Sequence, residues 1–159
     1  MTVAAREVLE DCRGAVDEIA SPIQGRAWRR RWVTAVVLLR TVGYVLSTVD
    51  SKHSQSYKVA IADAWEELNN TKPDPKIFWS FINEQRQNIV HEYHFDAGQG
   101  ATVHLSQNRP DEHHYRINSG AFINEDQRTV LRSAIAWWEE YLNKIDREAK
   151  KIAESTASS

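Results

Sequence analysis

The spacing of hydrophobic residues along the chain predicts a bundle of four to five helices. Apolar residues three or four positions apart indicate helices over residues 2–20, 24–50 and 75–95, and a long last helix that begins at Asn124, with Gln127 completing a capping box. After a break at residues 51–54, a further helix is expected. The side chains that it should direct into the core are those of Val59, Ala62, Trp65 and Leu68. The last helix repeats apolar residues every seven positions, at Leu131, Trp138, Ile145 and Ile152.

A β-hairpin is predicted between the last two helices. Residues 96–100 are rich in turn formers and are expected to be a turn that ends the preceding helix. Residues 102–105 and 114–117 alternate between apolar and polar side chains, and the segment between them is rich in turn formers. We expect Val103 and Leu105 to face Tyr115 and Ile117. The fold class is therefore mainly α, a helical bundle of four to five helices with a short β-hairpin inserted before the last helix. Residues 1–159 form one domain, with residues 154–159 expected to be a frayed tail.

Composition limits the classes of function. The chain of 159 residues is 42% hydrophobic and has a net charge of −2, so nucleic acid would have to bind a local basic patch. The lone Cys12 excludes an internal disulfide and is compatible with a reducing compartment. Residues 33–49 are apolar, but Arg40 lies at their centre, where a charge costs roughly 3 kcal/mol in a bilayer. We therefore expect a cytoplasmic protein that has no membrane span and no secretion signal.

The most informative feature is Arg86, followed five residues later by His91, in the segment FWSFINEQRQNIVHEYHF. On an α-helix Arg86 falls on the apolar face, and the residues within about 60° of it are Trp79, Ile82, Ile89, Val90 and Tyr93. A guanidinium never loses its charge, so its burial requires a partner or a purpose. An arginine beside a titratable histidine suits chemistry on phosphate.

The Arg-x4-His spacing in the penultimate helix of a bundle resembles the HEPN superfamily. The resemblance implies a metal-independent endoribonuclease, or a nucleotide-binding relative without activity, in which two motifs face each other in a homodimer. It also implies a toxin–antitoxin or mobile defence system, with RNA and a cognate antitoxin-like protein as partners. Gln87 departs from the small polar residue that often follows the arginine in this family. Arg109 and His114 have the same spacing, but they lie in the predicted hairpin.

This reading assigns a role to each residue of the motif and requires no cofactor or metal. His91 would move a proton of the ribose or of the leaving oxygen, and Arg86 would hold the phosphate. Substrate would also contact Asn83, Gln87, Asn88 and His94, the last of these as a second proton carrier. The stretch RAWRRRW adds Arg29, Arg30 and Arg31 beside Trp28 and Trp32. In such a combination the arginines can bind phosphates and the tryptophans can stack on bases.

Two alternatives use the same residues differently. In the first, Arg86 pairs with a carboxylate of a neighbouring helix, such as Glu66, Glu139 or Glu140, and the protein is a non-catalytic helical interaction module, a dimeric bundle that binds a protein or a nucleotide. In the second, the histidines between residues 91 and 114 bind zinc or nickel. These histidines are His91, His94, His104, His113 and His114, and their spacing matches no known metal motif.

Overall fold

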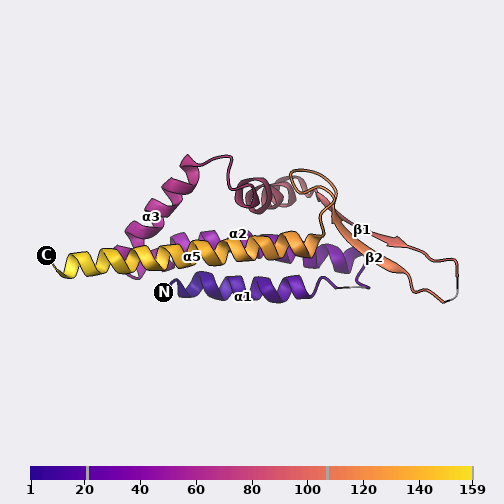
Figure 1. Cartoon of the computed structure of the whole chain (residues 1–159), viewed down its shortest axis with the longest axis horizontal. Coiled ribbons are helices and arrows are strands. Elements are labelled where there is room, and N and C mark those ends of the chain that lie inside the picture. The colour runs from indigo at the N-terminus through magenta and orange to yellow at the C-terminus, as the bar shows by residue number, and fades with distance from the viewer. Residues whose placement is uncertain (21, 107, 159) are drawn as a thin grey trace.

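Three long helices packed along their lengths form the body of the molecule (Figure 1). The computed structural model describes residues 1–20, 22–106 and 108–158. The three helices are α1 (Val3–Asp17), α2 (Gly25–Thr48) and α5 (Gln127–Ala157). After a short 3₁₀ turn at Asp50–Lys52, α3 (Gln55–Asn70) packs against α5 and diverges from it. The capping hydroxyl of Ser54 accepts a hydrogen bond from the N–H of Tyr57 and starts α3.

The helix that carries Arg86 and His91 lies across α2 and α5 (Figure 1). It consists of a π-helical segment η2 (Ile77–Asn83), the single α-turn α4 (Glu84–Gln87) and a second π-helical segment η3 (Asn88–Glu92). We call residues 77–92 the motif helix. Strands β1 (Ala97–Thr102) and β2 (Glu112–Ile117) follow it and form an antiparallel hairpin that extends beyond the helices. The predicted fold class, mainly helical with a hairpin before the last helix, is confirmed.

The predicted register of the hairpin is wrong. The first strand covers residues 97–102, so Ala97 pairs with Ile117 and Gln99 with Tyr115. Val103 and Leu105 lie beyond its end, 66% and 99% exposed. Two glycines make residues 96–100 resemble a turn in the sequence. In the structure Gly98 lies in β1 and allows the side chain of Asn118 to pack closely against the strand. A Cβ atom there would lie 2.4 Å from the Nδ2 atom of Asn118.

The inward face of α3 also differs from the prediction. Its buried residues are Ala60, Ile61, Ala64 and Leu68. Ala62 and Trp65, which were predicted to point inward, are exposed, and only Leu68 is buried as expected. Two small alanines four positions apart let α3 approach α5 closely, so this stripe rather than the larger Trp65 forms the contact.

The start of α5 is built around Gln127 rather than around a capping box with Asn124. Asp126 is the capping residue, and its carboxylate accepts the N–H of Thr129 at 3.1 Å. Gln127 is fully buried and joins three elements. Its amide nitrogen donates to the carbonyl oxygens of Gly98 and Arg116, while its oxygen accepts the indole N–H of Trp28 at 3.0 Å. This residue therefore fixes the base of the hairpin to α2 and α5.

At its other end, α5 continues as a helix through Ala157, so residues 154–157, which we expected to be frayed, are helical. The apolar segment of α2 has the length and composition to cross a membrane, a test that core helices of soluble proteins also pass. In the bundle, the side chains on one side of this helix, including Leu39 and Val42, are completely buried.

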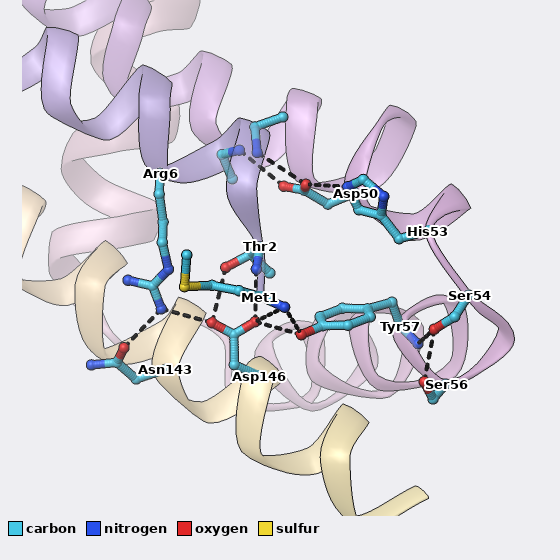
Figure 2. A network of polar contacts seen from close by, with 12 residues as sticks. Met1, Thr2, Arg6, Asp50, His53, Ser54, Ser56, Tyr57, Asn143 and Asp146 are labelled. Carbon is cyan, nitrogen blue, oxygen red and sulfur yellow. Dashed lines mark hydrogen bonds and ion pairs between the residues drawn. The ribbon is translucent and has the colours of Figure 1, made fainter. Parts of the chain in front are cut away.

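Two aspartates fasten the first residues of the chain to the bundle (Figure 2). The carboxylate of Asp146 accepts the backbone N–H of Thr2 at 2.8 Å and the guanidinium of Arg6 at 2.8 Å. Asp50, which is completely buried, accepts the backbone N–H groups of Ala4 and Ala5 at 3.1 and 2.9 Å. Asp50 therefore satisfies the otherwise unbonded amides at the start of α1 from a distant part of the sequence.

Replacing Asp50 tests this contact. The change Asp50→Ala leaves two N–H groups of the first turn without acceptors, one of them buried, and we expect the free energy of unfolding to fall by about 2–3 kcal/mol. Urea unfolding monitored by circular dichroism measures the change. Asp63→Ala, at an exposed position of α3, is the control, with an expected change below about 0.5 kcal/mol. Equal effects of the two substitutions would contradict the role of Asp50.

Candidate functional site: an arginine groove beside the motif helix

The hydrogen bonding of the motif helix determines how Arg86 and His91 are arranged. Arg86 lies in the single α-turn and His91 in the following π-helical segment. In a π-helix the N–H of each residue bonds to the carbonyl five positions earlier, so residues five apart lie on successive turns. The helix ends where Tyr93 adopts a left-handed backbone conformation with φ of 49°. Short π-helical segments are frequent at functional sites, so the two in this helix make it a candidate location for such a site.

The same geometry changes the face that the motif helix buries. The buried side chains are Phe78, Phe81, Ile82, Gln85 and Ile89. Val90 and Tyr93, which were predicted to lie on the apolar face, are 53% and 63% exposed. Arg86 is half-buried at the edge of this face instead of at its centre. The prediction assumed a uniform α-helical period, whereas the π turns advance the buried stripe by about one residue, so Gln85 takes the interior position.

Arg86 faces a groove between the motif helix and α2. The groove has a volume of about 270 Å³, and its lining residues are Val37, Arg40, Thr41, Tyr44, Arg86 and Val90. Arg40 is also half-buried. Burial, and the nearby positive charge of Arg86, lower the pKa of the Arg40 guanidinium. Because an arginine stays charged at neutral pH even so, the groove brings two positive charges together.

Neither guanidinium has an acidic partner among the residues that the structure describes. The arginines that form ion pairs in the described part of the chain are Arg6, Arg13, Arg31, Arg128 and Arg132. The predicted pairing of Arg86 with Glu66, Glu139 or Glu140 is therefore wrong for the described residues, and Glu139 is bonded to Arg13 at 2.8 Å instead. Two half-buried cations close together without a nearby counter-charge repel each other, and an anion that binds between them would remove that repulsion.

The other residues predicted to surround Arg86 lie outside this groove. His91 and Gln87 are exposed and Asn83 is half-buried, and in the described residues none of the three side chains has a hydrogen-bond partner. Asn88 and His94 do have partners, and both bond to the same residue, Asp96. The structure therefore separates the predicted site into an arginine groove, an exposed His91 and a cluster around Asp96.

Asp96 is a buried carboxylate that the sequence analysis did not identify as part of the site. It accepts the side-chain amides of Gln85 at 3.0 Å and Asn88 at 2.7 Å, the ring nitrogen of His94 at 3.1 Å, and the hydroxyl of Ser119. Burial opposes ionisation of Asp96, but the bonds from Ser119, Asn88 and Gln85 outweigh it, and together with His94 they lower its pKa.

This carboxylate also orients His94. The Nε2 atom of His94 faces Asp96, and the ring is otherwise 61% exposed. Because Asp96 is ionised at neutral pH, it favours the tautomer whose proton is on Nε2, and the Nδ1 atom remains available to accept a second proton. His94 consequently has the oriented ring that a proton carrier needs, whereas His91 has no such support in the described residues.

The predicted basic surface at the start of α2 is present only in part. The guanidinium of Arg31 is paired with Glu18 at 3.3 Å, whereas Arg29 and Arg30 are exposed. Arg29 lies over the ring of Phe95, 5.6 Å from its centre, which brings it next to the end of the motif helix. The expected base stacking on Trp28 and Trp32 is wrong, because these rings are only 6% and 0% exposed.

The histidines between residues 91 and 114 do not converge. His113 contacts Gln24, His114 contacts the hydroxyl of Thr102, and His104 lies 3.7 Å from Glu112. Residues 1–20, 22–106 and 108–158 contain no group of three or more histidine, cysteine or acidic side chains placed to hold a metal ion. The metal-binding alternative thus has no supporting geometry within these residues.

Comparisons with models of known families, with curated proteins and with solved structures find no match for this chain. The residues that bear on function are the two arginines of the groove, the histidines at the end of the motif helix, and Asp96.

Proposed function

We propose that this protein binds single-stranded RNA at the Arg40–Arg86 groove and cleaves it without a metal ion, as a HEPN-like endoribonuclease. The observation that supports this proposal is the pair of half-buried guanidiniums that share a groove and, within residues 1–20, 22–106 and 108–158, have no acidic partner. Phosphate is the anion that arginine binds best, through two parallel N–H···O bonds. A phosphate between Arg40 and Arg86 would neutralise both.

Cleavage would follow from the chemistry of the two histidines. One of them, His91 in the HEPN-like assignment, takes the proton of a ribose 2′-hydroxyl, and the 2′-oxygen attacks the neighbouring phosphorus. The bond from phosphorus to the 5′-oxygen breaks, and that oxygen takes a proton from protonated His94. Arg86 stabilises the negative charge that develops on the phosphoryl oxygens. The products are a 2′,3′-cyclic phosphate and a 5′-hydroxyl end, and DNA resists because it has no 2′-hydroxyl.

A homodimer is part of the proposal. Val37 and Val90 border the groove and are 36% and 53% exposed, so a second copy packed against them would cover apolar surface and bring two motifs together. The exposed Arg29 and Arg30 would extend the phosphate-binding track along α2. A cytoplasmic toxin–antitoxin or mobile defence system, with an antitoxin-like protein as partner, is the setting we propose.

Binding is tested with a fluorescein-labelled single-stranded RNA titrated in EDTA and followed by fluorescence anisotropy at several salt concentrations. Arg40→Ala and Arg86→Ala each remove a phosphate contact, and we expect each to weaken binding about tenfold and to reduce the salt dependence by roughly one ion. Arg109→Ala is the matched control, because Arg109 belongs to the other Arg-x4-His pair and lies in the hairpin loop. Equal affinities of all four proteins would contradict the proposal.

A second candidate function is binding of RNA or a nucleotide without cleavage, in a dimeric interaction module. The observation that favours it is the exposed His91, which has no orienting contact in the described residues. Both candidates use the arginine groove and give the same binding result. Assays of cleavage in EDTA separate them.

A further inference from the structure

A second hollow adjoins the arginine groove and is enclosed by α2, α3 and α5. Its volume is about 210 Å³, and it shares Arg40 and Tyr44 with the groove. The residues that complete its lining are Gly43, Leu46, Ser47, Ile61, Trp65, Leu68, Trp138 and Tyr141. We call it the aromatic pocket. None of the residues predicted from the sequence to form the site contributes to it.

The lining of the aromatic pocket suits a flat apolar group. Four of its ten lining residues are aromatic. Trp138 is 2% exposed and lies inside, whereas Trp65 and Tyr44 are 44% and 66% exposed and stand at the surface. A dry cavity of about 150 Å³ holds a benzene ring, so the 210 Å³ here is large enough for a larger planar ring.

Two features keep the aromatic pocket in place. The Trp65 ring contacts Phe78 and Trp79 with centroids 6.1 Å away, and these contacts hold it against the bundle. Gly43 allows the Trp138 ring to approach α2 and the Arg40 guanidinium to lie beside the helix backbone. A Cβ atom at this position would lie 2.9 Å from Trp138 and 3.1 Å from the guanidinium of Arg40. Any larger residue would therefore push against the two side chains that connect the pocket to the groove.

We propose that the aromatic pocket takes one unstacked nucleobase of the bound RNA, while the phosphate attached to that nucleotide lies on Arg40 and Arg86. This inference rests on the proposed function, and it identifies the place in the protein where a base of the RNA binds. A nucleotide joins a flat aromatic ring to an anion through a short sugar, and the pocket joins an aromatic lining to a cation through the shared Arg40. Aromatic side chains stack on any base, so the pocket favours single-stranded RNA without requiring a sequence.

The test compares two probes that differ only by the base: adenosine 5′-monophosphate and ribose 5-phosphate. Binding to the full chain is measured by isothermal titration calorimetry. We expect the wild type to bind adenosine 5′-monophosphate at least tenfold more tightly. Trp65→Leu should remove this preference and leave the affinity for ribose 5-phosphate unchanged. Trp137→Leu, a change at another partly exposed tryptophan outside the pocket lining, should retain the preference.

Gly43→Ala provides a second variant, which narrows the pocket without removing an aromatic ring. It too should lose the preference, and circular dichroism with urea unfolding establishes that each variant is folded. Equal affinity of the wild type for the two probes would overturn the base pocket while leaving phosphate binding at the groove intact. Loss of the preference in Trp137→Leu but not in Trp65→Leu would overturn it as well. If neither probe binds and labelled RNA does not bind either, the proposed function fails together with this inference.

Discussion

Replacement of His91 by alanine is expected to slow the cleavage of single-stranded RNA in EDTA by a factor of about 100 to 10,000, with the fold retained. This is the range that a single general acid or base contributes to catalysis. The side chain of His91 is exposed, so its removal leaves no cavity in the bundle. The measurement is the rate at which a labelled RNA is cut by wild type and variant under single-turnover conditions, with circular dichroism of both proteins.

The matched control for this prediction is His114→Ala. His114 follows Arg109 with the same spacing as His91 follows Arg86, but it lies on β2 and bonds to the hydroxyl of Thr102 at 2.8 Å. Its replacement should leave the cleavage rate within about twofold of wild type, because the substitution is remote from the motif helix. The RNA product should end in a 2′,3′-cyclic phosphate, and a 2′-deoxy substitution at the cleaved nucleotide should block the reaction.

Two other results of the cleavage assay would each change the proposal. If wild type cuts and His91→Ala cuts equally fast, His91 is not a proton carrier, and the oriented His94 becomes the residue to replace next. If wild type does not cut and still binds RNA through Arg40 and Arg86, the catalytic half of the proposal is wrong and the non-catalytic function stands.

The sequence was informative about helices because their apolar stripes are long. The heptad residues of α5 illustrate this, with Leu131, Trp138 and Ile145 all buried as predicted. Short elements were harder to predict, since glycine has several uses. Gly98 and Gly100 resemble turn residues in the sequence, but both lie in β1. There Gly98 leaves space for the side chain of Asn118. A contact between residues 20 positions apart is not visible as a local pattern.

The site was predicted in part. Arg86 was selected because it interrupts an apolar stripe, and it does line a groove, although Gln85 rather than Arg86 is the buried polar residue. The π-helical turns that cause this offset have no clear sequence signature. Arg40 carries the same signal in the sequence, a lone charge within an apolar run. The sequence places Asp96 in a stretch of turn formers, and its role as an acceptor is not visible there because its partners include Ser119, which is 23 positions away.

Replacement of Asp96 by alanine is expected to lower the free energy of unfolding by about 3 kcal/mol. The carboxylate is buried and accepts four side-chain hydrogen bonds, so its removal leaves donors of Gln85, Asn88 and Ser119 without an acceptor. These donors connect the motif helix to the segment after β2. His94 also loses the group that orients its ring, so the cleavage rate should fall even under conditions where the variant is folded.

The pH dependence of stability gives this prediction a second readout. Because the pKa of Asp96 is lowered in the folded protein, the folded state favours the ionised form more than the unfolded chain does. The resulting stability is fully present above the ordinary pKa of aspartate, roughly 4, and is lost as the pH falls through the lower pKa of the folded state. Wild type should therefore be more stable than Asp96→Asn to urea at neutral pH, and the difference should shrink below about pH 4.

Asp111→Asn is the control for the acid dependence, because Asp111 is exposed in the hairpin loop. The free energy of unfolding of the Asp111→Asn variant should equal that of wild type at every pH. If the difference between wild type and Asp96→Asn stayed constant through the acid range, the bonds to Asp96 would not depend on its charge. The cluster would then be ordinary polar packing, and the assignment of Asp96 as the group that fixes the tautomer of His94 would have to be abandoned.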